Sequence, residues 1–336
     1  MDASGLEEFL VNQNFTGVVD LRRGGDQVFA GAYGLASPRW GAPNLPSTRF
    51  DVASISKLFT SVAVLQLVEQ GTLDLEASIH DYADLAGTTI SPEVTLRQLL
   101  THRSGIADIA EEDEGENYAE VFAEYPCHLI VDTVDFVKIF AQKPANFAPG
   151  TEHRYCNAGY ILAGLAIEHA SGLGFRDYVH AEVFAPAAMT SSAYFDKRYA
   201  EPDLAEGFDS DDQGRLEQNI YAYPPIGHAD GGAFCTAGDL HAFLAALRAG
   251  QLLSPAWTDA FFTPQCPAGQ PDVLQGFGLE YRADRWWKEG CSEGASGIVQ
   301  HFSGIGLDAV VLANSAEGAW PVVDEIQRLA AASVSI

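Results

Sequence analysis

Residues 50–71 read FDVASISKLFTSVAVLQLVEQG, and this stretch predicts a buried helix that begins beside two polar side chains. Apolar residues fall on nearly every face between positions 58 and 68, which is typical of a helix enclosed by other elements. Gly71 supplies a C-terminal stop. Ser54 and Lys57 are three residues apart, so both side chains project from one face of the same turn. A hydroxyl and an amine therefore meet where the helix dipole is positive.

The Ser-x-x-Lys pair allows two interpretations when this stretch is considered alone. In the first, Ser54 is an N-cap and Lys57 extends into solvent. In the second, burial lowers the pKa of Lys57, and an amine of low pKa beside a hydroxyl activates Ser54 as a nucleophile. The second interpretation requires partner residues elsewhere in the chain.

The composition indicates a globular protein with a large negative charge. Of 336 residues, 47% are hydrophobic and 19% charged, enough for a sizeable core. The chain has 19 Lys and Arg against 46 Asp and Glu, a net charge of −27, which argues against nucleic acid as a partner because phosphates would be repelled. No apolar run reaches the roughly 18 residues of a membrane span. The N-terminus carries no export signal, so we expect a cytoplasmic protein, or an exported mature form whose leader has been removed.

Five cysteines lack the C-x-x-C spacing of a metal site, and we expect free thiols that pack as small apolar groups. They are Cys127, Cys156, Cys235, Cys266 and Cys291. We expect neither a metal ion nor a cofactor. No internal repeat or low-complexity segment interrupts the chain.

Strand patterns at both ends of the chain predict one antiparallel sheet. Residues 16–36 alternate in polarity around a Gly-Gly turn, which indicates a β-hairpin. Three further strands and a closing helix are predicted at residues 276–287, 294–302, 307–314 and 320–334. The middle of the chain is mostly helix and loop, so the sheet must be assembled from strands that are distant in sequence.

This pattern predicts an α+β fold of the α/β sandwich type, with an antiparallel sheet of about five or more strands flanked by helices. We expect residues 1–79 and 226–336 to form the domain that contains the sheet. Residues 80–225 would form an inserted, mostly helical region.

Two later motifs supply partners for the Ser-x-x-Lys pair. Tyr155 and Asn157 flank a cysteine just before another apolar helix, and in an extended segment their side chains share one face. Lys288 and Gly290 flank Glu289 on a predicted strand, where the glycine lets another chain approach the backbone.

In this order, Ser54-x-x-Lys57, Tyr155-x-Asn157 and Lys288-x-Gly290 resemble the penicillin-recognising serine hydrolases. The similarity is greatest to the class C β-lactamase branch, which also includes D-alanyl-D-alanine carboxypeptidases, D-aminopeptidases, esterases and acyltransferases. It extends from about Gly17 to the end and includes TLRQLLTHRSGIAD, FAPGTEHRYCNAGY and HADGGAFCTAGDLHAFL. The chain departs from the β-lactamases and carboxypeptidases at Glu289, where those enzymes usually have threonine or serine. It also lacks the E-x-x-L-N segment of class A enzymes.

The resemblance implies a β-lactamase/transpeptidase-like fold and an acyl-enzyme formed on Ser54, with Lys57 and Tyr155 sharing the proton transfers. Asn157 would orient the lysine and bind a substrate amide. The backbone N–H groups of Ser54 and Cys291 would form an oxyanion hole.

Lys288 would bind a substrate carboxylate at a partly exposed pocket mouth, and Gly290 would allow the close approach of its strand. The positive charges of Lys288 and Lys57 would lower the pKa of Tyr155. His102 and His228 lie in segments that match the family but are left outside the catalytic set, because histidines beside apolar runs are more often structural.

We therefore expect a serine hydrolase that cleaves an amide or ester through Ser54, with a β-lactam or D-amino-acid peptide-like substrate. One alternative is a carboxylesterase or acyltransferase of the same fold. Another, from a different class, is a catalytically idle ligand-binding protein. The expected partner is a small-molecule or peptide substrate, and the sequence does not determine the oligomeric state.

Overall fold

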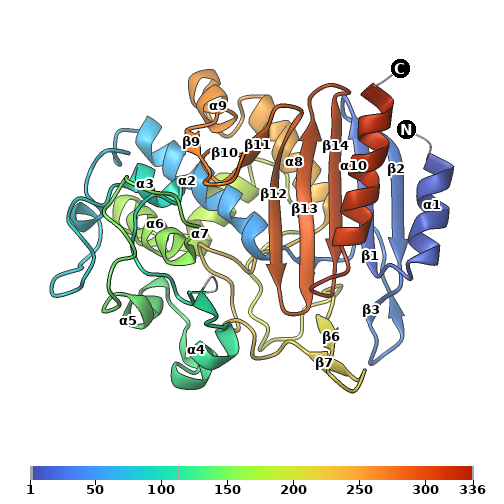
Figure 1. The fold of residues 1–336 in the computed structure, drawn as a ribbon, viewed down its shortest axis with the longest axis horizontal. Coiled ribbons are helices and arrows are strands. Elements are labelled where there is room, and N and C mark those ends of the chain that lie inside the picture. The colour runs from blue at the N-terminus through green and yellow to red at the C-terminus, as the bar shows by residue number, and fades with distance from the viewer. Residues whose placement is uncertain (1–2, 112–113, 335–336) are drawn as a thin grey trace.

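The computed structural model describes residues 3–111 and 114–334, and an eight-stranded antiparallel sheet lies at one side of the molecule (Figure 1). The strand order is β2-β1-β14-β13-β12-β11-β10-β9. The strands are β1 (Gly17–Arg23), β2 (Asp26–Tyr33), β9 (Cys266–Pro267), β10 (Leu274–Gln275), β11 (Glu280–Arg282), β12 (Arg285–Ser292), β13 (Ala295–Phe302) and β14 (Leu307–Ala313). The predicted fold class is confirmed, because strands from both ends of the chain share one sheet.

The hairpin predicted near the N-terminus is confirmed as β1 and β2, and Gly24 and Gly25 both take positive φ angles in its turn. β1 also pairs along its whole length with β14, which joins the two ends of the chain. The prediction of a single strand over residues 276–287 is wrong. Arg282 and Arg285 are paired across a two-residue turn, so this stretch forms β11 and the start of β12.

Both faces of the sheet are covered, and its strands alternate between two hydrophobic cores. On β14, Val311 faces the core beneath α1 (Ala3–Asn12) and α10 (Trp320–Val334), whereas Val310 faces the larger core on the opposite side. Figure 1 shows α1 and α10 together on one face of the sheet. Helix α8 (Ala237–Arg248) contacts β1 and β14 from the other face. The closing helix was predicted from sequence, but α1 was not.

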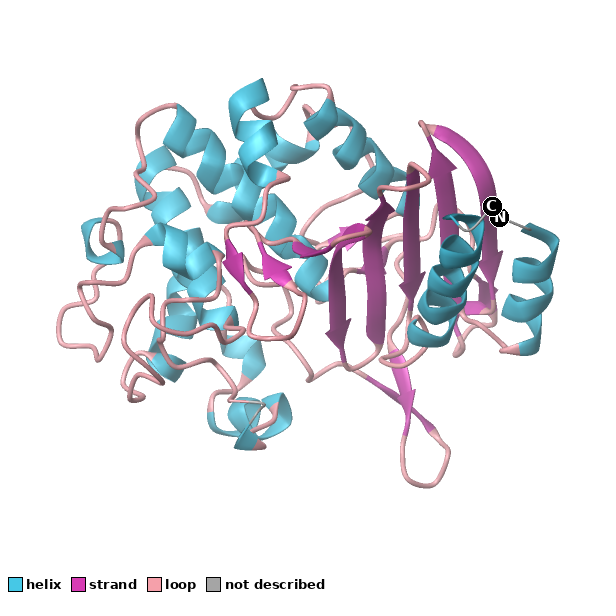
Figure 2. Cartoon of the chain, turned by 45° about the horizontal axis from the view of Figure 1, so that its top comes forward, coloured by secondary structure: helices cyan, strands magenta, loops and turns pink. Residues whose placement is uncertain are grey.

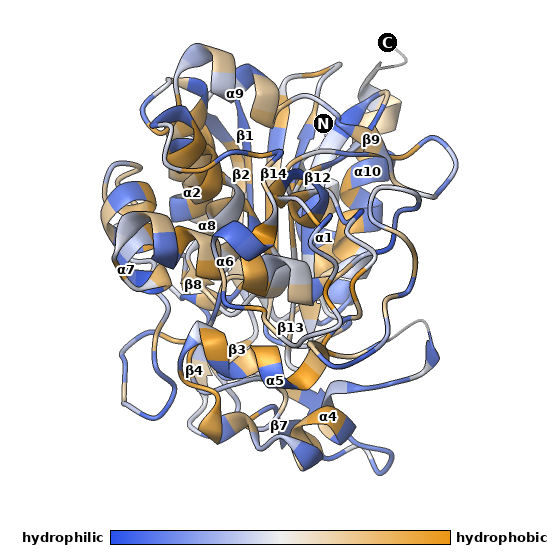
Figure 3. Cartoon of the chain, turned by 90° about the vertical axis from the view of Figure 1, so that its left-hand side faces the viewer, coloured by the Kyte–Doolittle hydropathy of each residue, from blue (hydrophilic) through white to orange (hydrophobic). Residues whose placement is uncertain are grey.

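The larger core is organised around α2 (Lys57–Glu69), the helix predicted from the opening stretch. Its residues from Lys57 to Leu67 are all buried, and much of the helix has hydrophobic colouring in Figure 3. Gly71, just beyond the helix, has a φ of 74°, as expected of a helix stop. The other helices are α3 (Leu96–Leu100), α4 (Tyr118–Glu124), α5 (Val137–Phe140), α6 (Asn157–Ser171), α7 (Phe175–Val179) and α9 (Pro255–Phe261).

Figure 2 shows that most helices gather beside the sheet, away from α1 and α10. Three two-stranded ladders connect the parts: β3 (Leu35–Ser37) with β4 (Ala42–Pro43), β5 (Phe50–Asp51) with β8 (Phe234–Cys235), and β6 (Phe208–Ser210) with β7 (Leu216–Gln218). Strand β5 lies shortly before the predicted nucleophile in the chain, and its pairing with β8 helps to fix the position of that residue. Within residues 3–111 and 114–334, no helix is both long enough and apolar enough to cross a membrane.

Candidate active site

Ser54 lies in a 3₁₀ turn, η1 (Ala53–Ser56), that leads directly into α2. The preceding residue, Ala53, has a φ of 42°, which is unusual for a residue with a side chain and occurs where surrounding contacts hold the backbone. The carboxylate of Asp51 accepts a 2.9 Å hydrogen bond from the N–H of Ala53. Ser54 occupies neither N-cap position, so the N-cap interpretation is wrong.

Lys57 is completely buried and does not reach solvent. Its Nζ donates to Ser54 Oγ at 2.9 Å, to Asn157 Oδ1 at 2.7 Å and to the carbonyl oxygen of Asp230 at 2.5 Å. Burial lowers the pKa of Lys57 to about 7; the nearby charge of Asp230 opposes this shift, and the charge of Lys288 reinforces it. Near neutral pH, a substantial fraction of this amine is therefore uncharged beside the serine hydroxyl.

Tyr155 approaches Ser54 from the other side, and its hydroxyl donates to Ser54 Oγ at 2.9 Å. The amines of Lys57 and Lys288 lie 5.1 and 4.8 Å from the centre of its ring. The expectation that these cations lower the pKa of Tyr155 is wrong. Although the residue is 39% exposed, the surrounding protein removes enough water to raise this pKa well above its usual value, and Glu280 adds to the effect.

Asn157 is the first residue of α6, so the start of a second buried helix meets the start of α2 at the lysine. The carboxylate of Asp108 accepts hydrogen bonds from the backbone N–H groups of Asn157 at 2.9 Å, Ala158 at 2.7 Å and Ile109 at 2.8 Å. Asp108 thereby caps α6 from a distant loop and holds Asn157 in position. Burial raises the pKa of Asp108 to about 6, against the effect of these hydrogen bonds.

Strand β12 brings the third predicted motif to the same place. Lys288 is only 2% exposed, so the expectation of a partly exposed side chain is wrong. A Cβ on Gly290 would lie 2.2 Å from the carbonyl oxygen of Val52, so only glycine permits this approach of β12 to η1. Cys291 is exposed and lines the pocket. β11 pairs with β12 only as far as Trp287, which leaves the following residues of β12 without β11 alongside.

The two histidines set aside from the catalytic set are both buried. His102 is buried; its ring centre is 4.3 Å from that of Tyr155, and its Nδ1 accepts a hydrogen bond from the N–H of Cys156 at 3.1 Å. Burial and the charges of the two site lysines hold the pKa of His102 well below its usual value, so the ring is neutral. His228 packs edge-on against Phe136 and also remains neutral, with a pKa of about 3 caused mainly by burial.

All three motifs meet at one pocket of about 680 Å³, whose lining includes Ser54, Tyr155, Asn157, Lys288 and Cys291. The described residues contain no cluster of three or more His, Cys, Asp or Glu side chains that could hold a metal ion. The hydroxyls of Ser54 and Tyr155 face this cavity, and the amine of Lys57 lies buried behind Ser54 with a lowered pKa. This set of groups is suited to nucleophilic attack on a carbonyl.

Sequence reasoning missed three contributors to this site. Asp108 is the last residue of the quoted segment TLRQLLTHRSGIAD, and Asp230 lies in HADGGAF, so both were inside recognised segments. Asp230 contributes a backbone carbonyl, which no side-chain pattern reveals. Glu280 was predicted to lie on a strand, but its position in the pocket depends on the hairpin of β11 and β12, in which it pairs with Trp287.

The chain belongs to the Beta-lactamase family, which it matches over residues 6–333. Among solved structures, it is similar to the penicillin binding protein from Bacillus halodurans, with a TM-score of 0.92 and 32% identity over 96% of this chain and 99% of that chain. The suggested resemblance to penicillin-recognising proteins is therefore confirmed.

Two relatives with known names extend the comparison. Penicillin-binding protein 4* of Bacillus subtilis (strain 168) is 27% identical over 277 residues, which cover 79% of this chain and 59% of the relative. Esterase EstB of Burkholderia gladioli is 29% identical over 206 residues, which cover 59% of this chain and 52% of the relative. The matched region therefore spans less than two thirds of either relative.

Proposed function

We propose that the chain is a serine hydrolase that cleaves an amide or ester through an acyl-enzyme on Ser54. One observation carries this proposal: Ser54 Oγ lies 2.9 Å from both Lys57 Nζ and the hydroxyl oxygen of Tyr155. Membership of the Beta-lactamase family supports the same class of reaction. So does the similarity to penicillin-binding proteins and an esterase. An idle binding protein would not require a buried lysine held against a serine.

Acylation begins when Ser54 Oγ attacks the substrate carbonyl and transfers its proton to the uncharged amine of Lys57. A bond forms between Oγ and the carbonyl carbon, and the bond to the leaving group then breaks. Tyr155 donates its proton to the leaving group, because its high pKa keeps the phenol protonated at neutral pH. Lys57 returns a proton to Tyr155, which balances the step. The two residues act as a coupled pair.

Water completes the cycle by attacking the acyl-enzyme, with the same groups moving protons in reverse. The backbone N–H groups of Ser54 and Cys291 stabilise the oxyanion in both halves, an effect of about 3 to 4 kcal/mol per donor. Gly290 allows these two N–H groups to lie close together, since a side chain at position 290 would push β12 away from η1. Asn157 holds Lys57 through its carbonyl oxygen. We propose that the substrates resemble β-lactams or D-amino-acid peptides, as the family suggests.

Intact-mass spectrometry tests this proposal directly. A fluorophosphonate should form one bond from Ser54 Oγ to phosphorus with loss of fluoride, and peptide mapping should locate the added mass on Ser54. In a separate sample, a β-lactam should acylate the same residue more slowly. The absence of any adduct, or an adduct on a different residue, would overturn the assignment of Ser54.

A further inference from the structure

Acidic side chains dominate the lining of the catalytic pocket, and most of them already have partners. Asp108 and Glu111 accept backbone hydrogen bonds, and Glu111 also forms an ion pair with Arg154 at 2.9 Å. Asp230 accepts a hydrogen bond from Tyr223 at 2.5 Å. These carboxylates are used internally, so they hold the site together and leave little capacity to bind a ligand.

Glu280 differs from this group, although it lines the same pocket. Among the described residues, no donor lies within hydrogen-bond distance of its carboxylate, and its nearest cation is Lys288 Nζ at 3.9 Å. The side chain is only 20% exposed. Burial raises the pKa of Glu280, and the neighbouring charge of Glu289 acts in the same direction. The carboxylate oxygens keep some contact with solvent in the pocket, so a cation with N–H groups can reach them and form charge-assisted hydrogen bonds.

The position of Glu280 brings this charge close to the proposed catalytic residues. The residue starts β11 and pairs with Trp287, directly before the part of β12 that runs past Ser54. Lys288 Nζ lies 3.9 Å from the carboxylate of Glu280 and 4.8 Å from the ring centre of Tyr155, so the carboxylate is near the phenol that donates to Ser54. Glu280 therefore lies in the part of the pocket that also holds Lys288 and Tyr155.

We propose that the carboxylate of Glu280 binds an ammonium group of the substrate, so that the enzyme prefers amine-bearing amides or esters. This inference rests on the proposed hydrolase function and adds a substrate class to it. A carboxylate-bearing substrate would instead meet the negative charges of Glu280 and Glu289. The preference is therefore the reverse of the one predicted from Lys288 alone.

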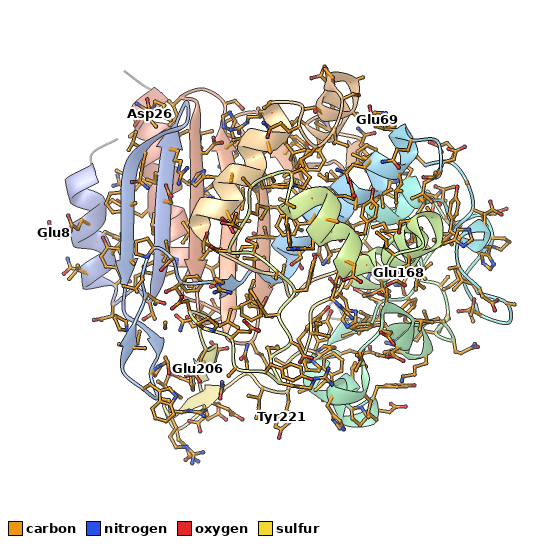
Figure 4. All side chains as sticks on the ribbon, turned by 180° about the vertical axis from the view of Figure 1, so that it is seen from behind. Glu8, Asp26, Glu69, Glu168, Glu206 and Tyr221 are labelled. Carbon is orange, nitrogen blue, oxygen red and sulfur yellow. The ribbon has the colours of Figure 1, made fainter. Side chains whose placement is uncertain are left out.

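A competing explanation is that Glu280 only neutralises Lys288. The two explanations differ in one measurable respect. A purely internal ion pair affects all substrates alike, whereas a binding site for ammonium affects amine-bearing substrates selectively. The effect of the chain's net negative charge on substrate binding must also be separated from the local effect of Glu280. Figure 4 labels acidic side chains, among them Glu8, Asp26 and Glu69, around the outside of the molecule.

The test compares three p-nitroanilides with acyl groups of differing charge: alanine with an ammonium, propionate with no charge and succinate with a carboxylate. For the wild-type chain at pH 7, we expect kcat/KM to be highest for the alanine compound, in either enantiomer, and lowest for the succinyl compound. In Glu280→Gln, the ratio of alanine to propionyl activity should fall about tenfold, mainly through KM. Added salt should reduce the wild-type ratio as well.

Glu293→Gln is the matched control, because Glu293 is exposed at the same pocket and loses the same charge. Its ratio should change less than about threefold, since an exposed charge is screened. An unchanged ratio in Glu280→Gln, or a wild-type preference for the succinyl compound, would overturn the inference. The wild-type measurement holds even if the variant fails to fold. Fluorophosphonate labelling of the same samples separates the proposed ammonium site from the proposed hydrolase function. If Ser54 is labelled but Glu280→Gln leaves the ratio of alanine to propionyl activity unchanged, only the role of Glu280 is wrong.

Discussion

The two walls of the pocket differ in how completely their polar groups are held. On the helical wall, Lys57 donates three hydrogen bonds, and Asp108 accepts backbone bonds at the start of α6. On the sheet wall, Glu280 has no hydrogen-bond donor among the described residues, and Lys288 has one carboxylate at 3.9 Å. The helical wall is therefore preorganised for proton transfer, whereas the sheet wall retains charge that a substrate can satisfy.

The strongest test of the helical wall is Ser54→Ala. This variant should lose all measurable turnover and all covalent labelling, because no other described hydroxyl lies between Lys57 and Tyr155. The free energy of unfolding should change by about 1 kcal/mol or less, since Lys57 keeps its bonds to Asn157 and Asp230. Labelling that survives in a folded variant would assign the nucleophile to another residue.

Removal of one oxygen from Tyr155 tests the proposed proton donor on the same wall. Tyr155→Phe keeps the ring that packs on His102 but should lower kcat/KM by at least about a hundredfold. Tyr160→Phe is a matched control, because Tyr160 also lies over Lys57 but bonds to the carbonyl oxygen of Leu100. Its kcat/KM should fall less than about threefold. Similar kinetics for both variants would reduce Tyr155 to a packing role.

The pH dependence should reveal the ionisation of the helical wall. A protonated Lys57 cannot accept the serine proton, so kcat/KM should fall as pH decreases through about 7 and level off above it. The pKa of Tyr155 is far higher and does not contribute in this range.

Asp108→Asn refines this assignment. Asparagine has one acceptor oxygen where Asp108 has two, so the cap on α6 is weakened and kcat/KM should fall by about tenfold. Because the charge of Asp108 raises the pKa of Lys57, its removal should shift the midpoint below 7. A limb that disappears would assign the titration to Asp108, whose own pKa is about 6, and a midpoint that shifts upward would contradict the assignment to Lys57.

The helical wall was largely predictable from sequence, because its geometry is local. The three-residue spacing of Ser54 and Lys57 on an apolar helix fixes their contact, and the resemblance supplied Tyr155 and Asn157. The burial of Lys57 followed from the apolar character of α2. Asp108 was missed because its role depends on a loop that meets α6 from about 50 positions away in the chain.

The sheet wall was less predictable, because its properties depend on long-range pairing. A single strand was expected where β11 and β12 form a hairpin, and this turn places Glu280 beside Lys288. The other predicted strands are β1, β2, β13 and β14 of the same sheet, but the two short strands β9 and β10 were not foreseen. The division of the chain into residues 1–79 with 226–336 and residues 80–225 stays a prediction.

The smallest expected effect is that of substituting Lys288. This substitution distinguishes binding of a substrate carboxylate by Lys288 from binding of a substrate ammonium group by Glu280. If this lysine binds a substrate carboxylate, Lys288→Ala should raise KM for the succinyl p-nitroanilide and leave the propionyl compound unchanged. Its burial and its 4.8 Å distance from the ring centre of Tyr155 favour another result. We expect kcat to fall for every substrate by about tenfold or less, which is the size of effect expected from the loss of one cation–π contact.

The same variant should also change substrate preference. Without Lys288, the carboxylates of Glu280 and Glu289 lose their nearby counter-charge, so the preference for the alanine compound over the propionyl compound should widen. Lys288→Met is the matched control, because it keeps the length of the buried side chain and removes only the charge. A wider preference in both variants assigns the effect to charge. A narrower preference would mean that the lysine, and not Glu280, sets the recognition at this wall.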